Sequence, residues 1–158
     1  MKLATLLYIR NSKGEYLLME RRRDPNKGLM SPPGGKLDTE KPESPTACAV
    51  REAYEECRIR SCEKDWHLRG IITEKNFPEA GNIMIFLMEY IKLINDLPPE
   101  CDEGAFSFIH PEKLTEHNIP LTDKFFIWDK ILNEEKIFID SLDCSGYPEI
   151  KNILTEIF

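Results

Sequence analysis

The sequence has no run of apolar residues long enough to cross a bilayer. The apolar stretch after Met1 ends at Arg10, and no small-residue cleavage site of a signal peptide follows it. No repeat, low-complexity segment or linker divides the 158 residues, so we expect one domain over residues 1–158. These absences predict a cytoplasmic protein with no membrane partner.

The sequence also lacks an excess of positive charge. It has 21 Lys and Arg against 28 Asp and Glu, which gives a net charge of −7. Such a chain is a poor binder of long nucleic acid, whose affinity for proteins comes largely from phosphate neutralisation. A small phosphorylated ligand stays compatible with this charge, because local cations and metal ions can offset the overall field.

Cysteines and histidines are few and lack the spacing of a metal or disulfide framework. The five cysteines form no Cys-x-x-Cys pair and are odd in number, which favours a reducing compartment. The three histidines have no metal-ligand spacing, and we assign them no role. The sequence therefore offers no signal for a zinc site or a disulfide-stapled fold.

Hydrophobic patterning predicts a mixed α/β domain with helices on both sides of a sheet. Strands are expected at residues 3–9 and 15–20, which form a hairpin, then at 66–75, 82–93 and 105–109, and at a sheet edge at 136–142. Helices are expected at 45–58, after the N-cap Ser44, at 122–131 and after Tyr147-Pro148, with one turn at 111–114; residues 21–33 are expected to be a loop.

The helix expected at 45–58 has an apolar side and an acidic side. A helical wheel places five residues on the core side: Ala47, Val50, Ala53, Tyr54 and Cys57. Glu52, Glu55 and Glu56 fall within an arc of about 100° on the opposite side. Carboxylates at this spacing repel one another, and a bound magnesium or manganese ion would relieve the repulsion. A solvated acidic face is the alternative interpretation.

A longer pattern surrounds these carboxylates. The stretch from Gly35 to Ile59 has the form Gly-x7-Glu-x7-Arg-Glu-x2-Glu-Glu and follows Pro33-Gly34. It resembles the Nudix box, and the Pro-Gly-Gly-Lys lead-in is similar to that of MutT-like members. The resemblance implies a Nudix-type α/β/α sandwich. It also implies a magnesium-dependent hydrolase, with manganese as an alternative metal, that cleaves a nucleoside diphosphate linked to another group.

The pattern departs from the family in two places. The first spacer carries two extra residues within the loop 37–42, so we align Glu43, rather than Glu40, with the first glutamate of the box. Arg58 stands where the family has a glycine suited to a left-handed helix C-cap. Keeping the same backbone with arginine would cost about 1 kcal/mol, so we expect an altered exit turn.

The resemblance also implies roles for individual residues. Glu55 and Glu56 would be the main metal ligands, with the Gly34 carbonyl as a third. Glu52 would be a further ligand or the base that activates water. Arg51 would orient Glu52 or Glu43 by a charge-assisted hydrogen bond, the alternative being a plain surface ion pair.

Four residues outside the helix are second candidates. Glu103 would be a metal ligand or base, or else a plain turn residue. Arg21 and Lys36 would bind substrate phosphates, or else be exposed basic residues. Asp123 would accept hydrogen bonds from a purine, as residues near the start of the last long helix do in MutT-like enzymes, or else cap that helix.

The expected partner is a small-molecule nucleotide, and both monomer and homodimer remain open. The leading hypothesis is hydrolysis of a nucleoside triphosphate, including oxidised purine nucleotides, to a monophosphate and pyrophosphate. One alternative is hydrolysis of ADP-ribose or a nucleotide sugar. Another is a non-catalytic Nudix ligand-binding module, although such proteins usually lose box carboxylates that are all present here.

Overall fold

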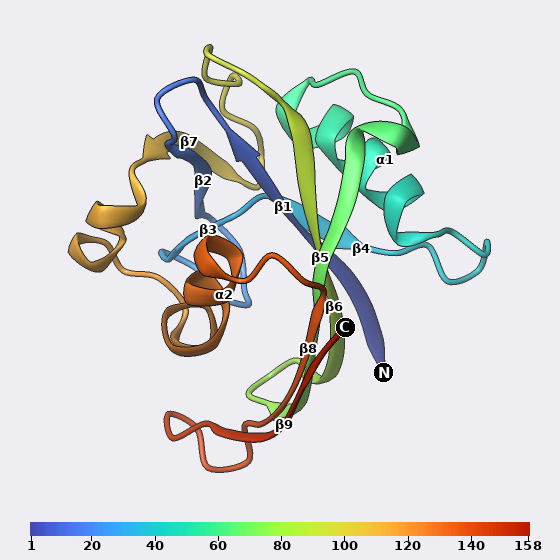
Figure 1. Ribbon diagram of the computed structural model, residues 1–158, viewed down its shortest axis with the longest axis vertical. Helices are drawn as coiled ribbons and strands as arrows, with labels where there is room; N and C mark the ends of the chain where they lie inside the picture. Colours follow the sequence, from blue (N-terminus) through green and yellow to red (C-terminus); the bar gives the residue numbers. More distant parts are fainter.

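The computed structural model describes residues 1–158 and contains one mixed sheet in the order β3-β2-β1-β6-β5-β8-β9, with β4 paired to β1 and β7 to β2 (Figure 1). The strands are β1 (Lys2–Arg10), β2 (Tyr16–Arg21), β3 (Met30–Ser31), β4 (Gly34–Lys36), β5 (Trp66–Phe77), β6 (Gly81–Leu93), β7 (Gly104–Ile109), β8 (Phe138–Asp143) and β9 (Lys151–Ile157). The helical segments are α1 (Pro45–Cys57), η1 (Glu63–Asp65), η2 (Pro111–Glu116), η3 (Asp123–Ile127) and α2 (Trp128–Asn133). No helix has the length and apolar character needed to cross a membrane.

The first two strands form a hairpin only next to their turn, where Arg10 pairs with Tyr16. Beyond that point β2 pairs with β7 and β3, while β1 pairs in parallel with β6 and antiparallel with β4. The segment expected to be a loop at 21–33 therefore includes the short strand β3. The β1–β4 pairing places Gly35 opposite Thr5, in the middle of the molecule.

Helix α1 begins and ends where the sequence predicts. The Ser44 hydroxyl accepts a hydrogen bond from the Ala47 N–H at 3.1 Å, and a proline follows at the first helical position. At the other end Arg58 adopts a left-handed backbone with φ of 57°, and its N–H donates to the Tyr54 carbonyl. The expectation of an altered exit turn is wrong, because Arg58 keeps the conformation usually given to glycine.

Two apolar cores lie on opposite faces of the sheet, and each is covered by one helix (Figure 1). Ala49, Ala53 and Cys57 of α1 pack in the first core with β-strand residues. Trp128 and Ile131 of α2 pack in the second core. The predicted α/β/α sandwich is confirmed.

The segment expected to be one helix at 122–131 contains two kinds of helix. The segment η3 is π-helical, and α2 continues from it as a regular α-helix. π-Helical turns are rare, and they occur frequently at functional sites. The segment η3 begins with Asp123, which the sequence singled out as a candidate base-binding residue.

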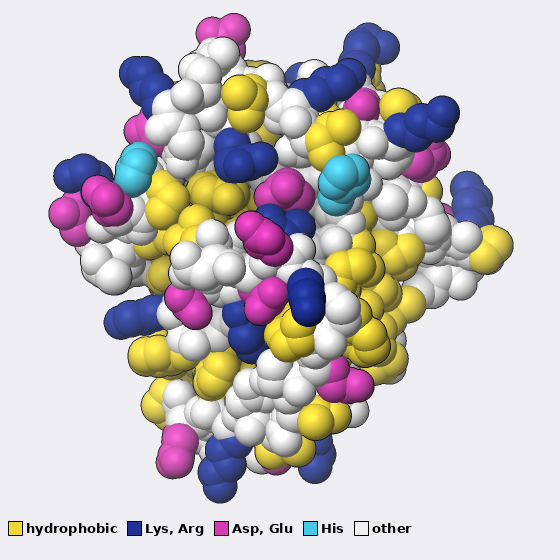
Figure 2. Space-filling view, viewed as in Figure 1, with side chains coloured by type: hydrophobic (Ala, Val, Ile, Leu, Met, Phe, Trp, Pro, Cys, Tyr) yellow, Lys and Arg dark blue, Asp and Glu magenta, His cyan; other side chains and the backbone are white.

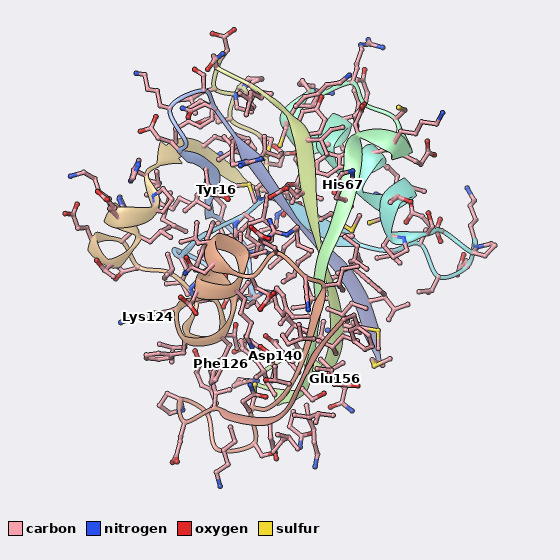
Figure 3. All side chains as sticks on the ribbon, viewed as in Figure 1. Tyr16, His67, Lys124, Phe126, Asp140 and Glu156 are labelled. Carbon is pink, nitrogen blue, oxygen red and sulfur yellow. The ribbon has the colours of Figure 1, made fainter.

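The C-terminal part differs from expectation in two ways. The segment after Tyr147-Pro148 forms strand β9 rather than a helix, and β9 pairs antiparallel with β8. Strand β8 is consequently an inner strand and not the predicted edge. Asp140 of β8 is fully buried and accepts hydrogen bonds from Thr155 of β9 and Lys130 of α2, which ties the three elements together (Figure 3).

Candidate active site

Two of the three carboxylates on the acidic side of α1 are buried. Glu52 and Glu56 each have 8% of their surface exposed, whereas Glu55 is exposed. Tyr54, which the helical wheel placed in the core, is 42% exposed. The helical wheel was therefore wrong about Tyr54. It also could not show that strand β4, with its two glycines, packs against the acidic side of the helix.

Arg51 connects the carboxylates of the candidate site. Its Nη1 donates to Glu52 Oε1 at 2.8 Å and to Glu55 Oε2 at 3.2 Å. Its Nε and Nη2 donate to the two oxygens of Glu43 at 2.8 and 3.0 Å, and Nη2 also donates to the Lys36 carbonyl. The guanidinium therefore makes more contacts than a plain surface ion pair would.

Glu43, which we align with the first glutamate of the box, contacts Arg51. Besides Arg51, it accepts a hydrogen bond from the Asp38 N–H at 2.7 Å. The Arg51 hydrogen bonds hold the pKa of Glu43 below its usual value. Glu40 shows no comparable contact: its N–H donates to Asp38 in the inserted loop. The structure thus places Glu43, and not Glu40, against Arg51.

Gly34 and Gly35 are needed in β4 because neighbouring atoms lie too close to its backbone for a Cβ. A Cβ on Gly35 would lie 2.2 Å from Glu52 Oε1, and a Cβ on Gly34 would lie 2.1 Å from the Thr5 carbonyl oxygen. The Gly34 N–H donates to Glu56 Oε2 at 3.2 Å. The two glycines therefore allow the backbone to lie directly against the carboxylates.

The buried carboxylates carry more negative charge than their surroundings neutralise. Burial first, and then the charges of Glu52 and Glu103, raise the pKa of Glu56 to about 8, against opposing effects of the Gly34 N–H and Arg21. Burial also raises the pKa of Glu52, although Arg51 opposes it. A divalent cation at this place would remove that cost.

The donor chemistry fits such an ion, but the side chains are not arranged around a common point where it would bind. The oxygens of Glu52, Glu55 and Glu56 are the ligand type that magnesium and manganese prefer. No group of three or more His, Cys, Asp or Glu side chains converges closely enough to hold a metal. Arg51 engages Glu52 and Glu55, and the Gly34 N–H engages Glu56, so metal binding requires these side chains to turn.

One cavity of about 460 Å³ is lined both by this acidic face and by residues of β5 and η3. Glu52, Glu56 and Glu103 line one end, and the buried residues Glu74 and Asp123 line the other. Gly34 and Gly35 also line the cavity. Glu56, Glu103 and the Gly34–Gly35 backbone thus lie around one cavity, and it is the Gly34 N–H, rather than the Gly34 carbonyl, that contacts Glu56.

Basic side chains lie at the cavity as well. Arg21 lines it, and its Nε donates to the Pro25 carbonyl at 2.8 Å. Lys36 lines it and is exposed. Arg23, which sequence reasoning did not select, lines it and forms an ion pair with Glu103 at 3.1 Å. Elsewhere on the viewed face, basic and acidic side chains are interspersed, with no continuous basic surface (Figure 2).

Asp123 is buried in the wall of the cavity and does not act as a helix cap. It is 4% exposed, and Thr122 is the N-cap residue of η3. Its Oδ1 accepts a hydrogen bond from the Thr122 hydroxyl at 3.3 Å, and its Oδ2 has no partner. The next residue, Lys124, is exposed on the outer side of the helix (Figure 3).

Glu74 is a cavity residue that sequence reasoning missed. It is 4% exposed, and burial raises its pKa to about 7. Burial and the charge of Glu74 raise the pKa of Asp123 to about 7 as well. The alternation along β5 is the signal that could have identified Glu74 as buried. Gly70, Ile72 and Glu74 all occupy buried positions two residues apart.

The fold and the glycine–carboxylate arrangement define an α/β/α protein with an acidic helix face against a Gly-Gly strand. A family model described as NUDIX domain matches residues 1–128. The chain therefore belongs to the NUDIX family, as the box predicted.

Solved structures of similar proteins confirm the fold. The mutator MutT protein from Bacillus halodurans is 20% identical, with 99% of this chain and 97% of that chain covered at a TM-score of 0.77. The MutT protein from Methanosarcina mazei Go1 is 23% identical, with 85% and 96% covered at a TM-score of 0.70. The NUDIX domain of NrtR from Shewanella oneidensis, solved with ADP ribose, is 13% identical, with 83% and 84% covered at 0.66.

Proposed function

We propose that the protein hydrolyses a nucleoside triphosphate to a nucleoside monophosphate and pyrophosphate with a divalent metal ion. The observation that carries the proposal is the single cavity that joins the acidic face of α1 to the buried carboxyls of Glu74 and Asp123. A nucleotide has the same division, with charged phosphates at one end and a hydrogen-bonding base at the other. The MutT names of two similar structures support this choice.

The metal would be held by Glu55, Glu56 and the Gly34 carbonyl, with Glu52 or Glu103 as a further ligand. Magnesium, or manganese in its place, would neutralise phosphate charge and lower the pKa of the attacking water. Arg51 contacts Glu52 and Glu55 directly and so positions two of the proposed ligands. Arg51 also fixes Glu43, whose carboxylate holds the guanidinium in place.

Proton transfer is assigned to Glu52, with Glu103 as the second candidate. The raised pKa of Glu52 makes it a stronger base than an exposed glutamate, which suits it to accept a proton from water. Arg21, Arg23 and Lys36 line the cavity and would contact phosphate oxygens, because their charges complement those of the substrate. Asp123, at the far end, would contact the base.

The cysteines and the net charge bear on the expected compartment and class of partner. All five cysteines are free, which agrees with a reducing compartment such as the cytoplasm. The net charge of −7 supports a small nucleotide rather than a nucleic acid polymer as partner. The acidic face alone would repel such a ligand, so the metal is needed for binding as well as for chemistry.

Product analysis over a substrate panel tests the proposal. Normal and oxidised nucleoside triphosphates, ADP-ribose, nucleotide sugars and dinucleoside polyphosphates are incubated with magnesium, and again after chelation. We expect pyrophosphate and a monophosphate from a triphosphate, and no turnover after chelation. ADP-ribose is the second candidate substrate, which the ADP ribose complex of the NrtR domain favours. Cleavage of ADP-ribose alone would replace the triphosphate as the assigned substrate. Absence of turnover on every substrate would instead favour a non-catalytic ligand-binding module.

A further inference from the structure

Glu103 lies in a tight turn at residues 101–104, directly before β7. Within the turn the Cys101 N–H donates to the Gly104 carbonyl at 3.0 Å, and the Gly104 N–H donates to the Cys101 carbonyl at 3.2 Å. Strand β7 then pairs with β2, with Gly104 opposite Arg21 (Figure 1). The exit side of the turn is therefore anchored in the sheet.

A second cavity, of about 530 Å³, lies between this turn and α1. Glu52, Glu55 and Glu56 of α1 line it, and so does the whole segment 99–103. Glu103 also lines the first cavity together with Glu52 and Glu56. Because Glu103 shares both cavities with proposed metal ligands of α1, its distance from them depends on where the turn is held.

The segment that leads into the turn has few contacts of its own. Residues 96–100 belong to no helix or strand, and they form no backbone–backbone hydrogen bond. Leu97, the one large apolar side chain of this segment, is 51% exposed. The hydrogen bond that reaches the segment joins Arg22 Nη2 to Glu100 Oε2 at 3.0 Å. The entry side of the turn is thus held from outside, by Arg22.

Arg22, the first residue after β2, contacts the turn at three points. Its Nη2 binds Glu100, and its Nη1 donates to the Cys101 carbonyl at 3.1 Å. Its backbone N–H donates to the Glu103 carbonyl at 3.0 Å. Because the guanidinium is planar, its two side-chain contacts define the orientation of the turn as well as its position. The next residue, Arg23, binds the Glu103 carboxylate instead, at 3.1 Å.

We propose that Arg22 is a positioning residue of the hydrolytic site, which holds the backbone of the turn 101–104 where Glu103 can serve the metal or the attacking water. This role rests on the proposed function, in which Glu103 is a further metal ligand or the second candidate for proton transfer. Arg22 lines neither of the two cavities, so it acts through the turn and not by contact with the substrate.

The two arginines divide the control of Glu103. For either role the Glu103 carboxylate has to leave Arg23, whose charge then becomes available to a phosphate oxygen. The side chain can make this movement while Arg22 keeps the backbone in place, because the Arg22 contacts are to Glu100 and to the carbonyls of Cys101 and Glu103. Removal of the Arg22 guanidinium should therefore affect the placement of the turn and leave the Arg23 ion pair available.

Amide hydrogen exchange tests the holding role without metal or substrate. In Arg22→Gln the amides of Cys101 and Gly104 should exchange about ten-fold faster than in the wild type, because the turn loses its outer anchor. The thermal unfolding temperature should stay near that of the wild type, since the Arg22 and Glu100 side chains are 47% and 66% exposed and ion pairs of this kind add little stability. Equal exchange in the two proteins would overturn the inference.

Lys113→Gln is the matched control for this experiment. Lys113 forms an ion pair with Glu116, the two side chains are 65% and 64% exposed, and neither residue lines a cavity of the site. The variant removes one exposed positive charge, as Arg22→Gln does. It should leave the exchange of the turn and the kinetic constants unchanged, so that a shared effect of both variants would mark a general effect of charge and contradict the role of Arg22.

Steady-state kinetics with the preferred substrate tests the route through Glu103. Arg22→Gln should lower kcat by about ten-fold and change KM by less than about two-fold, because Arg22 positions a group of the chemical step. In the Glu103→Gln background the same substitution should change kcat by less than about two-fold. Losses that multiply in the double variant would show that Arg22 acts elsewhere, and full activity of Glu103→Gln would leave nothing to position; either result would overturn the inference.

The outcomes separate this role from the proposed function. Cleavage of a different nucleotide, with no turnover of triphosphates, would refute the proposed function, and the same double-variant comparison on that substrate would still decide the role of Arg22. Triphosphate hydrolysis together with unchanged exchange and unchanged kcat in Arg22→Gln would refute only the role of Arg22.

Discussion

Arg51 holds Glu43 through two parallel hydrogen bonds, Nε to Oε1 at 2.8 Å and Nη2 to Oε2 at 3.0 Å. This arrangement leaves Nη1 free to donate to Glu52 at 2.8 Å. Because a bidentate contact fixes the plane of the guanidinium, Glu43 determines where Arg51 points and hence where Glu52 is held. We therefore expect Glu43 to influence the position of Glu52 through Arg51.

Arg51→Lys should lower kcat by about 10- to 100-fold, because an ammonium group cannot hold Glu43 and Glu52 at the same time. KM should change less, since Arg51 is not assigned to the substrate. Steady-state kinetics with the preferred triphosphate measures both values. Arg60→Lys is the matched control, because Arg60 is exposed and lies over the Tyr54 ring, and it should leave kcat unchanged. A kcat of Arg51→Lys equal to that of the wild type would disprove the positioning role.

Gly35→Ala should abolish most of the activity while leaving the protein folded. The new Cβ would lie 2.2 Å from Glu52 Oε1, so the carboxylate must move away from β4. Gly146→Ala serves as control, because its Cβ meets only the Glu149 carbonyl oxygen at an ordinary 3.5 Å. Activity and circular dichroism are compared for both variants. Full activity in Gly35→Ala would show that the placement of Glu52 against β4 is unimportant.

Glu56→Gln should reduce activity by about 100-fold or more, because it removes a proposed metal ligand. Metal-free Glu56→Gln should unfold at the same or a higher temperature than the wild type. The sign follows from the pKa of about 8 against 4.5 for an ordinary glutamate: the folded state prefers the protonated acid, and stability is lost as pH rises through about 8. Activity assays and thermal unfolding at about pH 8 measure the two effects; a variant that is both active and destabilised would contradict the assignment.

Asp123→Asn should flatten the pH dependence of stability. Burial and Glu74 raise the pKa of Asp123 to about 7 from 3.8, so the folded state binds more protons than the unfolded state. The stability from this group is complete below about pH 4 and is lost as pH rises through about 7. Urea denaturation at about pH 5 and pH 8 should show a fall smaller by on the order of 2 kcal/mol in Asp123→Asn than in the wild type. Parallel curves for the two proteins would argue against the burial of an ionisable Asp123.

Arg58→Gly should raise the free energy of unfolding by about 0.5 to 1 kcal/mol, since Arg58 has a left-handed backbone with φ of 57°. The Arg58 guanidinium also lies 5.9 Å from the centre of the Tyr54 ring, a contact that glycine removes. Arg58→Ala is the control for that contact, because alanine keeps the strain and loses the ring interaction. Chemical denaturation of both variants should show stabilisation by glycine and none by alanine; equal effects would exclude backbone strain as the cause.

The order of elements and the content of the box could be predicted from the sequence because their causes are local. Ser44 before proline starts α1, and the spacing of Glu43, Arg51 and Glu52 survives a loop insertion of two residues. The NUDIX assignment follows from the same stretch. Local signals of this kind do not depend on which distant segment packs against them.

The rest depends on long-range packing. The helical wheel cannot show that β4 covers Glu52 and Glu56, so it placed Tyr54 in the core and did not predict the burial of these two acids. Glu74 and Asp123 meet only when β5 and η3 pack together, and no pattern links them in the sequence. The segment 151–157 is too short for its apolar residues to distinguish helix from strand, and pairing with β8 decides in favour of a strand.

Phosphorus NMR of the products formed from the preferred nucleoside triphosphate of the panel tests the central claim most directly. Wild-type protein and Glu56→Gln are incubated in parallel with magnesium, and the spectra are followed over time. The account predicts the resonances of a nucleoside monophosphate and pyrophosphate with the wild type, none after chelation, and at most slow formation with Glu56→Gln. Formation of a nucleoside diphosphate and orthophosphate, or equal rates for the two proteins, would contradict it.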